Sequence, residues 1–336
     1  MHKMISKQDR IYIAGSKGMA GRAIKNSLIK GGYGDKSIGG EIVTTNRSEL
    51  DLLNSKLVDE WFENKKPNVV ILAAAKVGGI HANSVNPATF LLENLKIQTN
   101  VIEAAWRNEA KRLLFLGSSC IYPKFAEQPI REESLLEGQL EKTNEWYAIA
   151  KIAGIKLCES LRIQYDFDAI SLMPTNLYGK GDNYHPINSH VMASLLRKFY
   201  EAKIKNHESV SCWGTGSPMR EFMHVDDLGE ASLFALEKWD PNSKDAPRTK
   251  DDKPLSYINV GTGKDISIMN LANKIAKIFS YEGKIEWDKT KPDGTPKKQL
   301  DISRLSDLGW KAKIDLDEGI KITLKTINDD LNNYKN

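Results

Sequence analysis

The stretch IYIAGSKGMAG, residues 11–21, joins a short apolar run to three glycines spaced as G-x-x-G-x-x-G. The apolar run Ile11–Ala14 predicts a buried strand, and the apolar spacing from Met19 to Lys30 predicts a helix. Glycines at such a junction permit a sharp turn, and the free N–H groups at the helix start attract a phosphate. A glycine trio also fits an ordinary tight turn, but its place at the first strand-to-helix junction favours a dinucleotide pyrophosphate.

Predicted strands and helices alternate through the first half of the chain. Strands are expected near Ile42 and at Val69–Ala75, Leu113–Leu116 and Ala169–Met173, with long helices at Thr89–Arg107 and Glu145–Tyr165. This alternation predicts an α/β fold, a doubly wound parallel sheet of the Rossmann type with a smaller C-terminal substrate domain. We expect the cofactor domain to span residues 1–176 and 225–263, and the substrate domain to span 177–224 and 264–336.

Composition excludes several classes of protein. The chain has 336 residues, a net charge of +4 with both signs interspersed, and no apolar run long enough to span a membrane, which argues against nucleic-acid and membrane binding. Its first residues, MHKMISKQDR, contain no apolar stretch, so we expect no secretory leader. Three cysteines show neither a paired framework nor metal-ligand spacing, which predicts no metal site and a cytoplasmic location.

The end of the second predicted strand indicates which dinucleotide is bound. An NAD site usually places a carboxylate there for the ribose 2′-hydroxyl, but this strand ends in VTTNR, residues 43–47. Lys17 and Arg47 are instead suited to pair with a 2′-phosphate, although both also fit as ordinary surface cations. We therefore predict NADP(H) as the cofactor, with Asp51 and Leu52 near its adenine.

A second motif lies on the predicted helix 145–165. Tyr147 and Lys151 are four residues apart and share one helical face. A lysine cation beside a phenol is expected to lower the pKa of the tyrosine, which then donates a proton to a carbonyl oxygen as a hydride arrives. Ser118 follows the strand Leu113–Leu116, at the sheet edge where open parallel sheets bind ligands. The pair alone occurs by chance in many helices, but together with the glycine turn it predicts an active site.

With these motifs the chain resembles the extended short-chain dehydrogenase/reductase family. Within that family it is similar to the GDP-L-fucose synthases, from about Arg10 to Trp310. The stretches that carry the narrower resemblance are AAAKVGGI (73–80), GSSCIYPK (117–124), PTNLYG (174–179), NSHV (188–191), WGTG (213–216) and PMREF (218–222).

The resemblance implies an enzyme that converts GDP-4-keto-6-deoxy-D-mannose to GDP-L-fucose. It would invert C3 and C5 of the keto-sugar and then reduce the C4 ketone with NADPH. Ser118 and Tyr147 would hold the C4 oxygen, and Lys151 would tune Tyr147 and bind the nicotinamide ribose. The implied cofactor residues are Gly15, Ser16, Lys17, Gly18, Met19, Ala20, Gly21, Arg47, Asp51, Leu52, Ala73, Ala74, Ala75, Gly117, Ser118, Ser119, Tyr147, Lys151, Pro174, Thr175, Asn176, Leu177 and His190.

By the same resemblance, Cys120 and His190 form the acid/base pair for the epimerisations. Thiol and imidazole groups suit this role because their pKa values lie near neutrality. Taken alone, Cys120 would be a buried inert thiol and His190 a residue at a helix start. The residues implied to bind the GDP-sugar are Lys198, Trp213, Arg220, Asp293, Lys297 and Lys298. The family also implies a homodimer that packs helices 89–107 and 145–165 across a two-fold axis.

Other functions remain open at this stage. A 4-epimerase or 4,6-dehydratase of the same family is one alternative, but a dehydratase needs an acidic residue near Ser118, and the chain has Ser119-Cys120 there. A non-catalytic NADP-binding regulator is another, although it would not need Tyr147 and Lys151. Arg220 alternatively forms a surface ion pair with Glu221. The chain departs from the family at Ser16-Lys17 in the glycine turn and at Lys198, where arginine is common and binds phosphate in a bidentate manner.

Overall fold

A six-stranded, all-parallel sheet forms the centre of the larger lobe. The structure, a computed structural model, describes residues 4–332. The strands run in the order β2 (Glu41–Thr44), β1 (Arg10–Ala14), β3 (Val69–Leu72), β4 (Arg112–Leu116), β5 (Ala169–Pro174) and β9 (Tyr257–Val260). Strands β3, β4, β5 and β9 are buried along their whole length, which explains their continuous apolar runs. The predicted doubly wound parallel sheet is confirmed.

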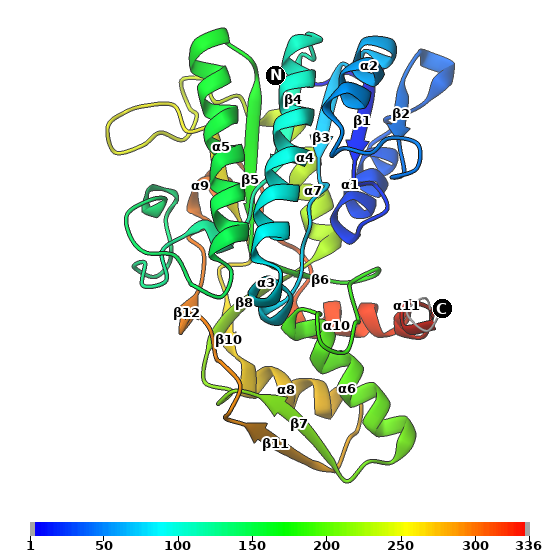
Figure 1. Ribbon diagram of the computed structural model, residues 1–336, viewed down its shortest axis with the longest axis vertical. Coiled ribbons are helices and arrows are strands. Elements are labelled where there is room, and N and C mark those ends of the chain that lie inside the picture. The colour runs from blue at the N-terminus through cyan, green and yellow to red at the C-terminus, as the bar shows by residue number, and fades with distance from the viewer. Residues whose placement is uncertain (1–3, 333–336) are drawn as a thin grey trace.

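Helices cover both faces of this sheet (Figure 1). Helices α1 (Met19–Lys30) and α7 (Val225–Lys238) pack together on one face. Helix α4 (Pro87–Arg107) packs between α2 (Ser55–Lys65) and α5 (Glu145–Tyr165) on the other. The short helices α3 (Ile80–Val85) and α9 (Ser303–Asp307) and the 3-10 turns η1 (Lys36–Ile38), η2 (Ser119–Ile121) and η3 (Glu132–Ser134) complete this lobe.

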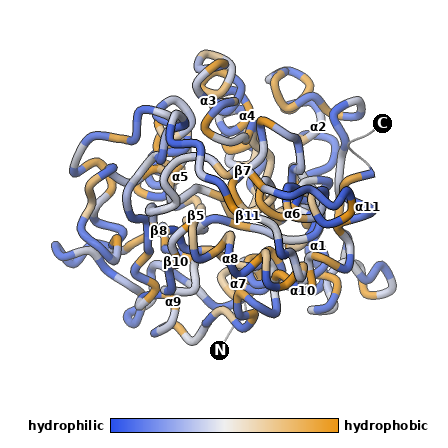
Figure 2. The backbone as a smooth tube through the Cα atoms, turned by 90° about the horizontal axis from the view of Figure 1, so that it is seen from below, coloured by the Kyte–Doolittle hydropathy of each residue, from blue (hydrophilic) through white to orange (hydrophobic). Residues whose placement is uncertain are grey.

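The smaller lobe lies beyond the carboxyl ends of the sheet strands (Figure 1). Its strands are β6 (Asn176–Tyr178), β8 (Met219–His224), β10 (Asp265–Ser267) and β12 (Lys297–Lys298), with a separate pair β7 (Ser209–Trp213) and β11 (Lys284–Asp288). Its helices are α6 (Val191–Lys205), α8 (Ile268–Ile278), α10 (Leu316–Leu324) and α11 (Ile327–Asn332). Seen from below, apolar stretches are concentrated on the helices and strands near the middle of the view, and polar loops surround them (Figure 2).

Two hydrophobic cores correspond to the two lobes, but their boundary differs from the expected one. The segment around α9 was expected in the substrate domain together with residues 264–336. Leu300, Leu305 and Trp310 instead belong to the core of the larger lobe. The reason is that α9 packs against β9 at the edge of the parallel sheet. The ends of the expected domains, residues 1–3 and 333–336, lie outside the described residues.

The turn after β1 requires its glycines. Gly15 has φ +88°, and a Cβ there would lie 2.6 Å from the backbone nitrogen of Ala74 at the end of β3. A Cβ on Gly21 would overlap the carbonyl oxygen of Gly15. Gly18 is the N-cap of α1 and provides no side-chain cap, so the first N–H groups of this helix stay available. This geometry is that of a cradle into which a phosphate fits.

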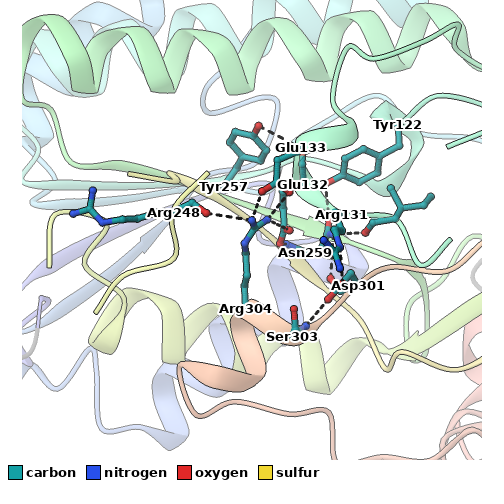
Figure 3. A network of polar contacts seen from close by, with 11 residues as sticks. Tyr122, Arg131, Glu132, Glu133, Arg248, Tyr257, Asn259, Asp301, Ser303 and Arg304 are labelled. Carbon is teal, nitrogen blue, oxygen red and sulfur yellow. Dashed lines mark hydrogen bonds and ion pairs between the residues drawn. The ribbon is translucent and has the colours of Figure 1, made fainter. Parts of the chain in front are cut away.

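A buried polar network anchors the long segment between β4 and α5 (Figure 3). Arg304 on α9 forms ion pairs with Glu132 and Glu133. Asn259 on β9 donates its backbone N–H to Glu132 Oε1 at 2.9 Å and accepts a hydrogen bond from the Tyr122 hydroxyl at 2.6 Å. These contacts tie the residues that follow the β4 turn to the sheet edge and to α9, so the turn itself is rigidly held.

Candidate active site

The candidate site is built from three turns at the carboxyl ends of β1, β4 and β5 and from the starts of two helices. Gly15 follows β1, Gly117 follows β4 and Thr175 follows β5, so all three lie at one edge of the sheet. Tyr147 lies in the first turn of α5, and His190 is the N-cap residue of α6 in the smaller lobe. The turns after β1, β4 and β5 therefore share one edge of the sheet, whereas His190 belongs to the smaller lobe.

Ser118 lies between the two other side chains that are expected to react, Cys120 and Tyr147. Its hydroxyl accepts a hydrogen bond from the Cys120 backbone N–H at 3.1 Å and caps η2. Its side chain also lies close enough to both Tyr147 and Cys120 to lower the pKa of each. The η2 turn therefore brings the Ser118 hydroxyl close to the Cys120 thiol, and the start of α5 brings the Tyr147 phenol close to the same hydroxyl.

The pKa of Tyr147 is raised in this ligand-free site, so the expectation that it is lowered is wrong. Burial and then the Cys120 charge raise the pKa of Tyr147, and only the Ser118 hydrogen bond lowers it. Lys151 is itself buried, and desolvation lowers its pKa to about 7. Its ammonium group donates to the Leu116 carbonyl at 2.7 Å and lies 5.9 Å from the Tyr147 ring centre. Tyr147 is consequently held as the protonated phenol that a proton donor must be.

Cys120 differs chemically from the other two cysteines. Burial alone would raise its pKa, but the charge of Lys298, hydrogen bonds from Ser118 and Lys298, and the charge of Arg220 together lower it below the ordinary value. Lys298 Nζ lies 3.5 Å from Cys120 Sγ. Burial raises the pKa of both Cys158, to about 12, and Cys212. Only Cys120 thus has the character of a reactive thiol among the three.

His190 lies at the start of α6 and is exposed to solvent as a whole residue. Protein atoms nonetheless crowd its imidazole, and this desolvation, followed by the charge of Lys298, lowers the pKa of His190 to about 4. It forms no side-chain cap on α6, so its expected alternative role as a capping residue is wrong. His190 is therefore neutral at pH 7 in the ligand-free site.

The expected cofactor residues line the edge of the sheet from β2 to β5. Lys17 and Arg47 are exposed, and Arg47 Nε lies 3.8 Å from Asp51 Oδ1, a loose pair that leaves its guanidinium accessible. Asp51 Oδ1 also accepts the Leu53 N–H at 3.2 Å, which orders the turn that carries Leu52. After β3 come three half-buried alanines with small side chains beside Gly15: Ala73, Ala74 and Ala75. At and after the end of β5 come Pro174, Thr175, Asn176 and Leu177.

Glu221 is a buried residue whose role the sequence did not reveal. Its carboxylate accepts backbone N–H groups of Thr262, Gly263 and Leu300, the last at 2.8 Å. Its backbone carbonyl accepts hydrogen bonds from the Thr175 hydroxyl at 3.2 Å and from Asn176 Nδ2 at 2.7 Å. Glu221 therefore does not pair with Arg220, and it joins the β5 turn, the β9 turn and the segment that follows β12.

The residues expected to bind the GDP-sugar lie in the smaller lobe. The ring of Trp213 is partly exposed at the end of β7, with Lys198 Nζ 5.7 Å and Lys291 Nζ 5.5 Å from its centre. Arg220 lies on β8, and its Nη1 donates to the Met219 carbonyl at 2.9 Å. Asp293 is engaged within the protein, since its two oxygens accept the Thr215 N–H and hydroxyl, each at 2.8 Å.

A small cavity adjoins the thiol. Besides Cys120 and Lys298 it is lined by Ser119, Tyr122, Pro123, Ile130, Glu141, Asn144 and Thr295. Glu141, Asn144 and Thr295 were not predicted. Glu141 and Asn144 lie in the turn just before α5 and Thr295 lies in a distant irregular segment, and no local pattern marks them. Glu141 pairs with Lys124 at 2.9 Å, so its negative charge is locally compensated.

Neither a membrane helix nor a metal centre is found in residues 4–332. No helix there combines the length and apolar character that a bilayer requires. That same part of the chain contains no cluster of three or more His, Cys, Asp or Glu residues that suits a metal ion. His224, Asp226 and Asp227, which resemble such a cluster in sequence, form the start of α7, where the His224 side chain accepts the Asp226 N–H.

Comparison with known proteins identifies the family. The model of the NAD dependent epimerase/dehydratase family matches residues 11–247. The chain belongs to this family. A GDP-L-fucose synthase of Escherichia coli (strain K12) is 51% identical over 323 residues, which cover 95% of this chain and 96% of the other. GDP-L-fucose synthase 1 of Arabidopsis thaliana is 50% identical, with 95% and 93% covered.

A solved structure in the same family shows the same fold with a dinucleotide. It is MlghC, a GDP-mannoheptose C4 reductase from Campylobacter jejuni with NADP bound. It superposes on this chain with a TM-score of 0.83 at 36% identity, over 96% of this chain and 99% of the other. The superposition shows that the two chains share their overall fold.

Proposed function

We propose that this chain converts GDP-4-keto-6-deoxy-D-mannose to GDP-L-fucose, by inverting C3 and C5 and then reducing the C4 ketone with NADPH. One observation carries the proposal. Cys120, with a lowered pKa, lies beside the hydrogen-bonded pair of Ser118 and Tyr147. A reductase needs only the latter pair, whereas epimerisation also needs a base next to the same sugar ring. The names of the relatives at 50–51% identity support the same reaction.

The chain's own residues fit NADP(H). The cradle at Gly15, Gly18 and Gly21 excludes side chains and exposes helix N–H groups toward a pyrophosphate. Lys17 and Arg47 are accessible cations beside β1 and β2, and residues 45–47 directly after the second strand contain no carboxylate. When bound, the reduced cofactor supplies the hydride for C4. Lys151, buried at the end of β4, binds its ribose, and residues 174–177 border its nicotinamide.

Epimerisation uses the acidity that the C4 ketone gives to the neighbouring C–H bonds. Cys120 as thiolate takes the proton from one of C3 and C5, releases it to solvent, and then takes the proton from the other, while Ser118 and Tyr147 stabilise the enolate oxygen by hydrogen bonds. His190 delivers a proton to the opposite side of the ring. Because His190 is neutral at pH 7 in the ligand-free site, it must gain a proton on substrate binding. The negative diphosphate of the substrate, near Arg220 and Lys298, provides the field that raises its pKa.

Reduction uses the phenol of Tyr147. As hydride reaches C4, the Tyr147 hydroxyl donates its proton to the C4 oxygen, while Ser118 keeps that oxygen in place. Lys151, with a pKa of about 7, is near enough to the phenol to stabilise the phenolate that results. Trp213, Lys198 and Arg220 hold the GDP portion, and Asp293 orders the Thr215 turn beside them. On this proposal the larger lobe is the cofactor domain and the smaller lobe is the substrate domain.

Other substrates and assemblies are distinguishable. A reductase acting on a GDP-heptose, the substrate class of MlghC, is less favoured because that protein is only 36% identical. A dehydratase is disfavoured because no carboxylate occupies residues 118–120.

We also propose a cytoplasmic homodimer through α4 and α5, which expose Leu92, Ile149 and Ile163. A molar mass in solution of twice 37.7 kDa would support the dimer.

The decisive experiment supplies the purified chain with GDP-4-keto-6-deoxy-D-mannose and NADPH. We expect the absorbance of NADPH to fall and the product to be GDP-L-fucose, identified by NMR from its inverted C3 and C5. A parallel reaction with a 4-keto GDP-heptose serves as the comparison. Faster turnover of the heptose, or no consumption of NADPH with the mannose derivative, would contradict the proposal.

The cofactor preference gives a separate prediction. Replacing Lys17 and Arg47 by alanine should weaken the preference for NADPH over NADH. A charge-assisted hydrogen bond contributes about 1.5–3 kcal/mol, which is roughly tenfold to hundredfold in relative kcat/KM for each residue. Lys30→Ala, an exposed cation at the far end of α1, is the matched control and should leave the ratio unchanged. Equal efficiency of the unaltered enzyme with both cofactors would refute the assignment.

A further inference from the structure

A lysine from the smaller lobe contacts the proposed epimerisation base. Lys298 Nζ lies 3.5 Å from Cys120 Sγ, although the two residues are 178 positions apart in sequence. The thiol belongs to the turn after β4 in the larger lobe, and the lysine belongs to β12. The contact therefore joins the two lobes in the ligand-free protein.

The register of β12 determines which lysine faces the thiol. Strand β12 pairs in parallel with β8, so that Lys297 lies opposite Met219 and Lys298 opposite Arg220. Successive side chains of a strand point to opposite faces. Lys297 accordingly forms an ion pair with Asp265 at 3.4 Å on one face, while Lys298 reaches Cys120 on the other.

The position of Lys298 is built into the fold. The next two residues are held from both lobes, because Gln299 N–H donates to Gln128 Oε1 at 2.9 Å and Leu300 N–H donates to the buried Glu221 carboxylate at 2.8 Å. Gln299 Nε2 also donates to the Gly263 carbonyl at 2.7 Å. The backbone next to Lys298 is therefore fixed, and the lysine side chain extends from it to the Cys120 thiol.

The charged groups around the thiol favour its anion. Lys298 on β12 and Arg220 on β8 are both positive, and both lower the pKa of Cys120. Tyr147 on α5 is held protonated and carries no charge at neutral pH, and His190 on α6 is neutral as well. The one carboxylate that lines the adjoining cavity, Glu141, is paired with Lys124.

We propose that Lys298 is a positioning residue for epimerisation, whose ammonium group holds Cys120 as a thiolate ready to accept a proton from the keto-sugar. The inference rests on the proposed function but adds a distinct role, since Lys298 was expected only to bind the substrate. The thiol proton passes to solvent in the ligand-free enzyme. The C3 or C5 proton then moves to sulfur, and the electron pair of the broken C–H bond moves into the enolate.

The test measures the thiolate directly, without substrate. Alkylation of Cys120 by iodoacetamide is followed against pH by mass spectrometry, with Cys158 and Cys212 as buried thiols that should not react. Lys298→Met should move the midpoint of the profile to higher pH, whereas Lys298→Arg should keep it low. A nearby opposite charge lowers a pKa by about 1–3 units. Because a more basic thiolate is also more nucleophilic, we expect alkylation at pH 7 to slow by about threefold or more.

Lys297→Met is the matched control, since its side chain lies on the opposite face of β12. Its profile should match that of the unaltered enzyme. An unchanged midpoint in Lys298→Met, with the fold intact by circular dichroism, would overturn the inference. An equal shift in Lys297→Met would overturn it too, because the effect would then come from net charge. Neither outcome depends on GDP-4-keto-6-deoxy-D-mannose being the substrate, so this failure and that of the proposed function are distinguishable.

Discussion

Tyr147→Phe should reduce the keto-sugar roughly 10²–10⁴-fold more slowly than the unaltered enzyme, which is the usual contribution of a positioned general acid. The substitution removes the hydroxyl that burial keeps protonated and hydrogen-bonded to Ser118, but it keeps the ring. The dissociation constant of NADPH should change little, because the phosphate cradle and Lys151 are untouched. Stopped-flow absorbance of NADPH measures the chemical step, and fluorescence titration measures cofactor binding.

Tyr165→Phe is the control for this change. Tyr165 ends the same helix, and its side chain is about half exposed at 49%. It stacks on Trp106 with ring centres 4.5 Å apart, at the far end of α5 from the strand turns. Its substitution should leave reduction intact. A near-normal rate in Tyr147→Phe would show that another group protonates the C4 oxygen.

Cys120→Ser should abolish epimerisation while leaving hydride transfer in place. A hydroxyl is a far weaker acid than a thiol, so the serine stays protonated near neutral pH even beside Lys298 and Arg220. Exchange of the C3 and C5 hydrogens with D₂O, followed by NMR without NADPH, should slow by about 10²–10⁴-fold, the worth of a general base. With NADPH present, the variant should reduce the unepimerised ketone and yield a GDP-6-deoxy sugar with unaltered C3 and C5.

The controls separate the two halves of the reaction. Cys212→Ala removes a buried thiol in the smaller lobe and should leave the exchange rate unaltered. His190→Asn should also slow exchange, because it removes the proposed proton donor on the other side of the ring. Undiminished exchange in both Cys120→Ser and His190→Asn would assign the epimerisation to other residues.

Local patterns predicted the parts of the site that depend on short stretches of chain. The glycine turn could be predicted because strand, turn and helix are contiguous and because Gly15 and Gly21 leave no space for a Cβ. Tyr147 and Lys151 share a helical face by spacing alone. The charge state of this pair could not be predicted, because it depends on burial that tertiary packing creates. Lys151 is 3% exposed and therefore has a lowered pKa in place of the expected effect on Tyr147.

Contacts made by short or irregular segments could not be predicted. Strand β12 is two residues long and follows a turn-rich stretch, so no periodicity marks it as a strand or gives its register. Its pairing with β8 alone decides that Lys298, and not Lys297, reaches Cys120. The role of Glu221 was hidden for the same reason, since its three backbone partners come from two separate later segments.

The path of the chain between the lobes limits how this enzyme can be re-engineered. The polypeptide leaves the parallel sheet after β5, returns for α7 and β9, leaves again for β10, and comes back for α9 before ending in α10 and α11. The smaller lobe, which we propose to bind the sugar, is therefore not a separable segment of the chain. A chimera with a different sugar specificity would have to splice several separate pieces at once, and every junction beside Glu221 would have to keep its backbone partners. Changing specificity by point substitution around Trp213 is the more practicable route.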